Sequence, residues 1–189
     1  MKIPSFSTLG IALTLLLAFT AELFRFHGYL LLDLFVPIFV ATWLLTRLLR
    51  KQSLRLSHTL LPAALFAGLG LASLLLNSAE MSTGDFLSSA FYGIRWVSLY
   101  ALSVIVLNRS PQEKLQIFWG LAIFTLLLSV AGFVQLKIQP DFTNFEDLGW
   151  DPHQSRLLST WFDPNFVGGF LAFSIPLLLG VGLDKKNLR

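Results

Sequence analysis

Arg156 is the residue whose type and position best suit binding chemistry, because it shortly precedes Asp163-Pro164-Asn165. Its planar guanidinium can donate two parallel hydrogen bonds to phosphate oxygens. Asp163 and Pro164 are typical of the cap and the first position of a helix, whose free backbone N–H groups and dipole attract anions. These features predict a binding site for a diphosphate, with Trp161 placed against lipid or sugar. The simpler alternative is a loop that anchors the chain without a ligand.

Arg95 is the second candidate, because it lies within an apolar stretch. An arginine at the centre of a membrane helix costs about 2.5–3.5 kcal/mol on insertion scales, and less near the interface. We expect Arg95 near the outer end of its helix, where its side chain reaches the interface or holds an anionic headgroup. Asp33, at the start of another apolar run, is a candidate ion-pair partner for Arg25 or Arg95.

Two other groups of residues match no known template. Asp151, His153, Ser155 and Ser159 supply the residue types of a hydrolytic triad, but they lack the Gly-x-Ser-x-Gly turn that exposes a nucleophilic serine. The acidic residues of 137–165 are spaced irregularly and fit neither a calcium nor a zinc site. The chain has no cysteine, which excludes disulfides and thiolate ligands. We therefore predict no metal site.

The elements that must position these residues are hydrophobic helices. The chain has 189 residues, of which 54% are hydrophobic and only 13% charged, whereas soluble domains carry about 25% charged residues. Its mean hydropathy is +0.68. The net charge of +3 comes from basic residues that lie between apolar runs, so it indicates membrane topology and no nucleic-acid partner. The predicted fold class is an all-α integral membrane protein, with the lipid bilayer as its surroundings.

The apolar runs predict a polytopic bundle of about six transmembrane helices, since a spanning helix needs about 20 mostly apolar residues. The predicted spans are residues 8–24, 29–45, 60–76, 91–107, 111–136 and 164–183. Ser110 and Glu113 form a capping box with Pro111 at the first helical position, which marks the fifth start. The first run continues past Ala21, so we interpret it as a retained helix and not as a signal peptide.

The distribution of Lys and Arg predicts the orientation. With the N-terminus in the cytoplasm, ten of these residues lie on the cytoplasmic side and four on or near the outer side. Both termini are then cytoplasmic. Residues 1–136 form five helices with short loops, 137–164 an external loop and 165–189 the sixth helix with a cytoplasmic end. The loop is net acidic and interleaved with aromatic residues, which favours the membrane interface.

Residues 156–171 read RLLSTWFDPNFVGGFL and resemble a segment of the O-antigen ligase and O-antigen polymerase family of bacterial membrane proteins. In that family an arginine is followed by a patch of small and aromatic residues, and then by Pro-Asn at the start of an apolar helix. The positions that fill this pattern are Arg156, Thr160, Phe162, Pro164, Asn165 and Gly168. The five preceding hydrophobic spans agree with the N-terminal half of the family.

The resemblance implies a multi-pass enzyme of the bacterial inner membrane. It would transfer a glycan from an undecaprenyl-diphosphate donor to an acceptor glycan or protein at the outer face. Arg156 is the implied catalytic residue, because it would stabilise the charge on the departing diphosphate. The substrate-binding residues that we predict are Arg95, Trp161, Pro164 and Asn165. No cofactor is implied, since the lipid carries the activated sugar.

The resemblance is limited to the N-terminal half of the family. Its members continue into further helices and a later external loop with another arginine and a histidine, and no residue here matches that loop. We therefore expect the chain to be the N-terminal part of such an enzyme, inactive alone. Two alternatives remain from the sequence: a transporter or flippase component, and a non-enzymatic membrane subunit for assembly or sensing.

Overall fold

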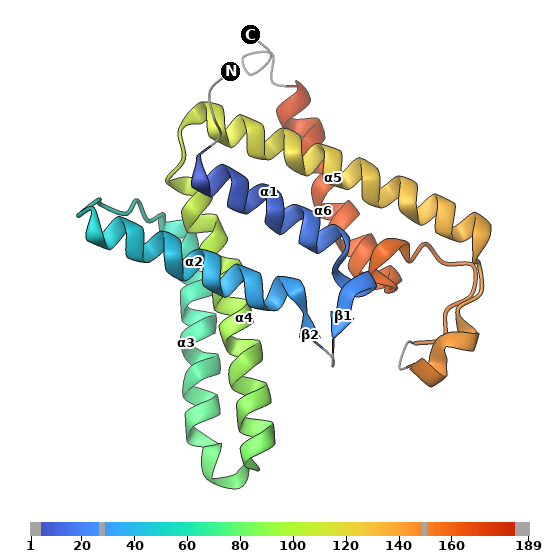
Figure 1. Ribbon diagram of the computed structural model, residues 1–189, viewed down its shortest axis with the longest axis horizontal. Coiled ribbons are helices and arrows are strands. Elements are labelled where there is room, and N and C mark those ends of the chain that lie inside the picture. The colour runs from blue at the N-terminus through green and yellow to red at the C-terminus, as the bar shows by residue number, and fades with distance from the viewer. Residues whose placement is uncertain (1–4, 27–28, 149–150, 184–189) are drawn as a thin grey trace. The chain divides into compact units, whose positions relative to one another are not determined.

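The computed structural model describes residues 5–26, 29–148 and 151–183. The described residues form six α-helices (Figure 1). Their bounds are α1 (Phe6–Phe19), α2 (Leu31–Leu49), α3 (Leu61–Leu76), α4 (Thr83–Leu107), α5 (Pro111–Ile138) and α6 (Pro164–Leu183). Each helix overlaps one predicted span, so the helical character and the order of the elements agree with the sequence.

Four of the described helices, α2, α4, α5 and α6, are long and apolar enough to cross a membrane. The helices α1 and α3 are apolar but shorter, with 14 and 16 residues. Large apolar side chains cover the surface of the helices; Leu76 is 84% exposed and Phe133 66%. So much exposed apolar area is unfavourable in water and is typical of helices in lipid. The chain is an α-helical membrane protein, and a full count of six spans stays a prediction.

Short elements connect the helices. A hairpin of two-residue strands, β1 (Arg25–Phe26) and β2 (Tyr29–Leu30), precedes α2. The 3-10 turns are η1 (Ala21–Phe24), η2 (His58–Leu60), η3 (Ser78–Glu80), η4 (Thr143–Leu148) and η5 (Ser159–Trp161). The first predicted span, 8–24, is therefore too long at its C-terminal end, because α1 stops at Phe19 and η1 follows it.

The chain divides into two units. The first contains Met1–Ile11 and Leu32–Lys114, and the second contains Ala12–Leu31 and Leu115–Arg189. In the first unit, Phe39 and Trp43 of α2 are buried, and the ring centroid of Phe6 lies 5.6 Å from that of Phe39. A Cβ atom on Gly10 would lie 2.1 Å from the Phe39 ring. The packing of α1 on α2 therefore requires glycine at this position.

The helices α3 and α4 run side by side and are joined through η3 (Figure 1). The α4 helix begins at Thr83, where the Ser82 hydroxyl accepts a hydrogen bond from the Asp85 N–H at 3.1 Å. The predicted start at residue 91 is therefore wrong. Residues 83–89 are mostly polar, so hydropathy alone assigned them to a loop, whereas the serine cap starts a helix there.

The second unit packs α5 and α6 around a small apolar core. Phe124 and Leu128 of α5 and Val167 of α6 are buried together. Leu15 and Phe19 of α1 pack against the same cluster. This core places the start of α6 and the segment before it, which contains Arg156, next to the C-terminal half of α5.

The predicted starts of the last two helices are confirmed. The Ser110 N–H donates to Glu113 Oε2 at 3.1 Å and the Glu113 N–H donates to Ser110 Oγ at 3.3 Å, which is the expected capping box at Pro111. The α6 helix begins at Pro164 directly after Asp163. Both starts were predictable because a cap depends only on residues close in sequence.

Candidate functional site

The loop between α5 and α6, residues 139–163, folds back on itself and returns to α5. Asp141 and Gln154 form an antiparallel bridge. The Phe142 N–H donates to the His153 carbonyl at 2.9 Å, and the Ser155 N–H donates to the Pro140 carbonyl at 2.8 Å. These backbone hydrogen bonds fix the position of Ser155, the residue immediately before Arg156.

Gln135 on α5 fixes the loop on the other side of Arg156. Its side-chain oxygen accepts hydrogen bonds from the Leu158 N–H at 2.8 Å and from the Ser159 N–H at 3.3 Å. Its amide nitrogen donates to the Gln139 carbonyl at 2.8 Å. Sequence reasoning missed Gln135, because a glutamine near a helix end carries no local sign of a partner more than twenty residues away.

Ser159 is buried, and its side chain attaches the loop to α5. Its hydroxyl donates to the Leu128 carbonyl at 2.7 Å, and its side chain is 2% exposed. The backbone at Ser159 is left-handed, with φ at 53°. A hydroxyl committed to a helix carbonyl is not a free nucleophile, which adds a geometric reason against a hydrolytic triad in this loop.

Trp161 anchors the segment before α6. Its indole N–H donates to the Ala18 carbonyl at 2.7 Å. Its ring lies 6.1 Å from that of Phe124 and 5.4 Å from that of Phe170, measured between centroids. The N–H and much of the ring are therefore occupied within the protein. Only the exposed part of the Trp161 ring is available for the predicted contact with substrate.

Asp163 caps α6 and changes one expectation. Its Oδ1 atom accepts hydrogen bonds from the Asn165 N–H at 2.7 Å and from the Phe166 N–H at 3.2 Å. The prediction that the first N–H groups of this helix are free for an anion is wrong, because a carboxylate already holds them. Pro164 contributes no N–H. The polar group that remains exposed at this helix start is the side chain of Asn165.

Arg156 is exposed between the two points where the loop is fixed. Within the part of the chain that the structure describes, its side chain has no hydrogen bond and no carboxylate within ion-pair distance. The backbone around it is held by Pro140 on one side and by Gln135 on the other. The structure thus presents an uncompensated guanidinium from a fixed piece of chain.

Arg95 lies in the first unit and in a different setting. It is twelve residues from each end of α4, so the expected position near the helix end is wrong. Its Nε atom lies 2.9 Å from Asp33 Oδ1, and the Asp33 side chain is 3% exposed. Arg95 is one of the two partners that we considered for Asp33, and this pair is confirmed; the side chain of the other, Arg25, lies outside the described residues. The carboxylate offsets the cost of the charge within an apolar helix.

Asp141 organises the start of the loop. Its Oδ1 atom accepts hydrogen bonds from the Thr143 hydroxyl at 2.7 Å and from the Thr143 N–H at 2.9 Å. Hydrogen bonding to Thr143 holds the pKa of the Asp141 carboxyl below its ordinary value. Across the described residues, no group of three or more His, Asp or Glu side chains is placed to hold a metal ion.

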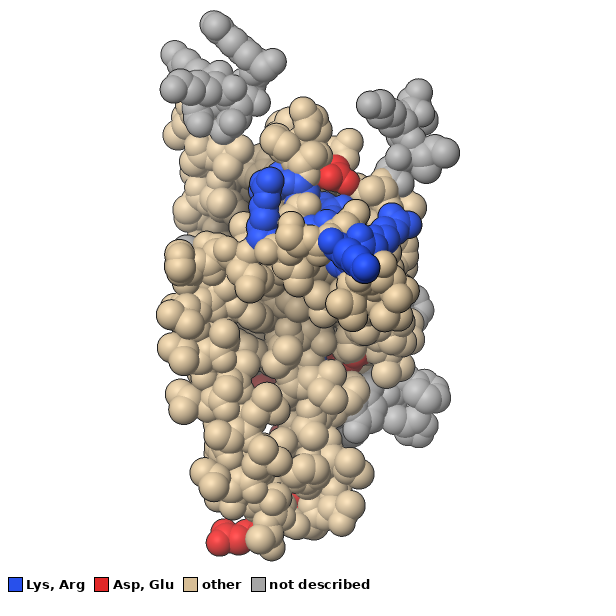
Figure 2. Space-filling view, turned by 90° about the vertical axis from the view of Figure 1, so that its left-hand side faces the viewer, with Lys and Arg blue, Asp and Glu red and all other residues tan. Residues whose placement is uncertain are grey.

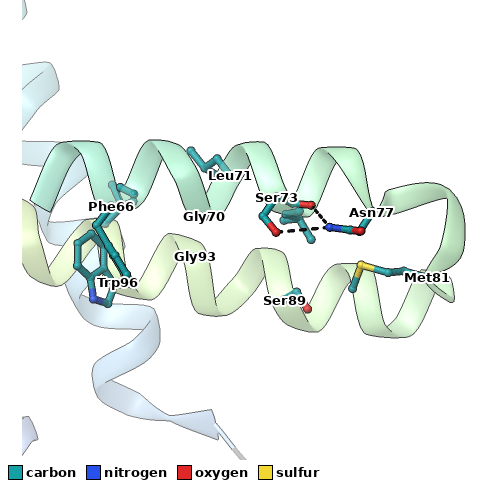
Figure 3. A pocket seen from close by; sticks show the side chains of 12 residues that line it. Phe66, Gly70, Leu71, Ser73, Asn77, Met81, Ser89, Gly93 and Trp96 are labelled. Atoms are coloured by element: carbon teal, nitrogen blue, oxygen red, sulfur yellow. Dashed lines mark hydrogen bonds between the residues drawn. The ribbon is translucent and has the colours of Figure 1, made fainter.

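A groove of about 340 Å³ lies between α3 and α4 and is separate from the predicted site residues (Figure 3). Phe66 and Trp96 close one end, with ring centroids 5.0 Å apart. At the other end, the Asn77 amide donates to the Ser73 carbonyl at 2.7 Å. The groove is mainly apolar and carries no charged side chain, so we assign no chemistry to it.

Comparisons with the models of known protein families, with curated proteins and with solved structures find no match for this chain. The functional argument therefore depends on residues 156–171 and on the geometry of the loop that presents them. Within that geometry Arg156, Trp161, Pro164 and Asn165 belong to one segment of the second unit, and Arg95 belongs to the first unit.

Proposed function

We propose that the chain is the N-terminal part of a membrane glycan transferase similar to O-antigen ligases and polymerases. Its donor is an undecaprenyl-diphosphate-linked glycan, and its acceptor is a glycan or a protein at the outer face of a bacterial inner membrane. The segment from Arg156 to Asn165 supports this proposal most directly. It contains an exposed arginine and, in the first turn of the apolar helix α6, an exposed asparagine.

The observation that carries the proposal is the state of Arg156. Two other arginines of this protein have internal partners, since Arg95 is paired with a carboxylate and Arg47 is stacked on a ring. Arg156 has neither kind of partner among the described residues, although hydrogen bonds hold the chain on both sides of it. An exposed guanidinium on a fixed backbone is suited to an anionic ligand that comes from outside.

The chemistry follows from the charge that the reaction produces. An acceptor oxygen attacks the anomeric carbon of the donor, and the bond from that carbon to the diphosphate oxygen breaks. The diphosphate leaves with the electron pair. The Arg156 guanidinium would donate to these oxygens as their charge grows, and the Asn165 amide would supply a further donor. The α6 backbone contributes no N–H here, since Asp163 holds the first two.

The test is Arg156→Ala in the complete gene, with glycan transfer measured in cells and protein abundance controlled. We expect transfer to fall by about 10²-fold, the size seen when one charge-stabilising donor is removed. Arg156→Lys should recover only part, because an ammonium lacks the planar fork. Lys137→Ala is the matched control, since it removes an exposed positive charge just before the same loop. Normal transfer by Arg156→Ala would contradict the site assignment.

One observation favours a second candidate, a transporter or flippase component. The Asp33–Arg95 ion pair lies halfway along α4 in a helix long enough to span a membrane, and charged pairs at that depth often line substrate pathways. The double variant Asp33→Asn, Arg95→Gln removes both charges with little change in volume. If the protein translocates a lipid-linked glycan, this variant should stop translocation in proteoliposomes, whereas Arg156→Ala should not.

A further inference from the structure

A basic patch in the first unit consists of Arg47, Arg50, Arg55 and Arg109, which line two cavities. Figure 2 shows basic side chains gathered on one face of the molecule. Arg47 in the last turn of α2 donates to Asn108 Oδ1 at the end of α4, at 2.8 Å. Arg109 donates to the Ser7 hydroxyl at the start of α1. Ser5 donates to Glu113 Oε1 in the first turn of α5 at 2.6 Å. These contacts gather residues that the charge distribution had assigned to one side of the membrane.

Two adjoining cavities open in this patch, with volumes of about 530 Å³ and 370 Å³. Both are lined by Arg47, Gln52, Asn108 and Arg109. Arg55 lines the larger cavity and Arg50 lines the smaller one. The pair of cavities is therefore surrounded by arginines, neutral polar groups and one carboxylate, Glu113, which lines the smaller cavity. The space has room for a phosphate group with its substituents.

The positive charge of the cavities is largely uncompensated. The two terminal nitrogens of Arg47 donate to the neutral amide oxygens of Gln52 and Asn108. Within the described ranges of the chain, the one carboxylate at ion-pair distance from these arginines is Glu113, 3.7 Å from Arg109. The Nε atoms of Arg47 and Arg109 are buried and lack a hydrogen-bond partner among the described residues.

The arginines are also held in place. The Arg47 guanidinium lies 5.2 Å from the Trp43 ring centroid and that of Arg109 lies 6.0 Å from it. Tryptophan and arginine at the end of an apolar helix mark the depth of the lipid headgroups. The apolar part of α2 ends here, with Arg47 in its last turn. The cavities therefore lie at the level where a bilayer presents its phosphates.

From this arrangement we propose a second anion site in the protein, built by Arg47, Arg50, Arg55 and Arg109 for a phosphate-bearing molecule at the membrane surface. The ligand is the headgroup of an anionic phospholipid in the adjacent leaflet, or a soluble phosphate. The fixed pair Arg47 and Arg109 forms the base of the site. Arg50 and Arg55, whose side chains are exposed, close over the ligand. This site is independent of Arg156 and of the glycan transfer proposed above.

The test uses the purified chain, stripped of lipid in detergent, with phosphatidylglycerol, phosphatidylcholine and inorganic pyrophosphate as separate probes. Native mass spectrometry counts bound lipid, and thermal unfolding measures its effect on stability. Phosphatidylglycerol binding that pyrophosphate does not displace identifies a lipid site. Binding of pyrophosphate that lowers phosphatidylglycerol binding identifies a site for soluble phosphate. If neither probe binds more tightly than phosphatidylcholine, the proposal is wrong.

The variant is Arg50→Gln, Arg55→Gln, because neither side chain makes a hydrogen bond or an ion pair with another described residue. The control is Lys51→Gln, Lys114→Gln, which removes two exposed charges from the same end but changes no residue that lines either cavity. We expect the affinity for the anion to fall about tenfold or more for each arginine removed, the factor for a hydrogen bond to a charged group of about 1.5 kcal/mol, and to fall less in the control. Equal losses in both double variants would show only general charge attraction and would overturn the proposal.

Discussion

Arg95 and Arg156 differ in how their positive charges are compensated. On α4, the Arg95 charge is neutralised by the buried carboxylate of Asp33 at 2.9 Å. In the loop before α6, the charge of Arg156 has no such partner among the described residues, and the protein instead fixes the backbone on either side of it. Around Arg95 an ion pair fixes the arginine side chain, whereas around Arg156 hydrogen bonds fix the backbone and leave the side chain exposed.

The difference teaches where to look for a ligand. A neutralised arginine inside a helix is tolerated by the fold because its charge is compensated, and it has little charge left to offer. An arginine with an ordered backbone and no carboxylate partner keeps its electrostatic attraction for an external anion. The following four predictions test whether the two regions really depend on these different interactions.

The largest expected effect is on the Arg95 region. Asp33→Ala leaves the guanidinium without its carboxylate, and we expect the free energy of unfolding to fall by about 3 kcal/mol, the lower end for a broken buried pair because Arg95 is partly exposed. Thermal unfolding of the purified protein in detergent measures this loss. The double variant Asp33→Leu, Arg95→Leu should recover most of it. A double variant as unstable as Asp33→Ala would mean that charge compensation is not what matters.

The second prediction concerns how the Arg156 loop packs on α5. A Cβ atom on Gly132 would lie 2.4 Å from Leu157 Cδ2 and 2.7 Å from its Cγ. We expect Gly132→Ala to displace Leu157 and to cost about 2 kcal/mol of unfolding free energy, as overpacking does. Adding Leu157→Ala should restore part of that loss, since the two residues contact each other. Strictly additive effects in unfolding measurements would contradict the packing.

A smaller effect is expected at Ser159. Ser159→Ala removes the hydrogen bond to the Leu128 carbonyl and should cost about 1 kcal/mol. Ser159→Gly removes the same bond but relaxes the left-handed backbone, whose φ is 53°. The glycine variant should therefore unfold at a higher temperature than the alanine variant. The reverse order in the same assay would show that relief of the left-handed backbone does not affect the stability of this turn.

The smallest effect is the pH dependence of the loop. Because hydrogen bonds from Thr143 lower the pKa of Asp141, its contribution to stability is complete above the ordinary carboxyl pKa and disappears as the pH falls through the lowered value. Hydrogen exchange of the Thr143 amide should therefore speed up below about pH 4, beyond the change expected from pH alone. In Asp141→Asn this additional change should be absent, since the amide does not titrate.

The success of sequence reasoning depended on the distance between interacting residues. The caps at Ser110 and Asp163 involve neighbours, and both predicted helix starts are confirmed. The same Asp163 cap removed the free N–H groups that we expected to bind an anion, because the side chain that starts the helix also occupies its donors. The Ser82 cap has the same local pattern, and we missed it because hydropathy dominated that prediction.

Contacts between distant residues were beyond the sequence. The acceptor role of Gln135 toward the backbone of residues 158–159 has no local pattern. The same holds for the bond of Trp161 to Ala18. Charge gave the best long-range information, since it supplied a correct partner for Asp33 and grouped Arg47 with Arg109, which the structure brings together. The side of the membrane on which they lie stays a prediction.

Asn108 has a consequence for covalent modification. The tripeptide Asn108-Arg109-Ser110 is an N-glycosylation sequon. The side-chain amide nitrogen of Asn108, to which the sugar would be attached, donates to the carbonyls of Arg55 and Val104, both at 2.9 Å. These two hydrogen bonds would have to break before an oligosaccharyltransferase could reach the amide nitrogen of Asn108. In the folded protein this sequon is therefore protected from glycosylation on whichever side of the membrane it lies.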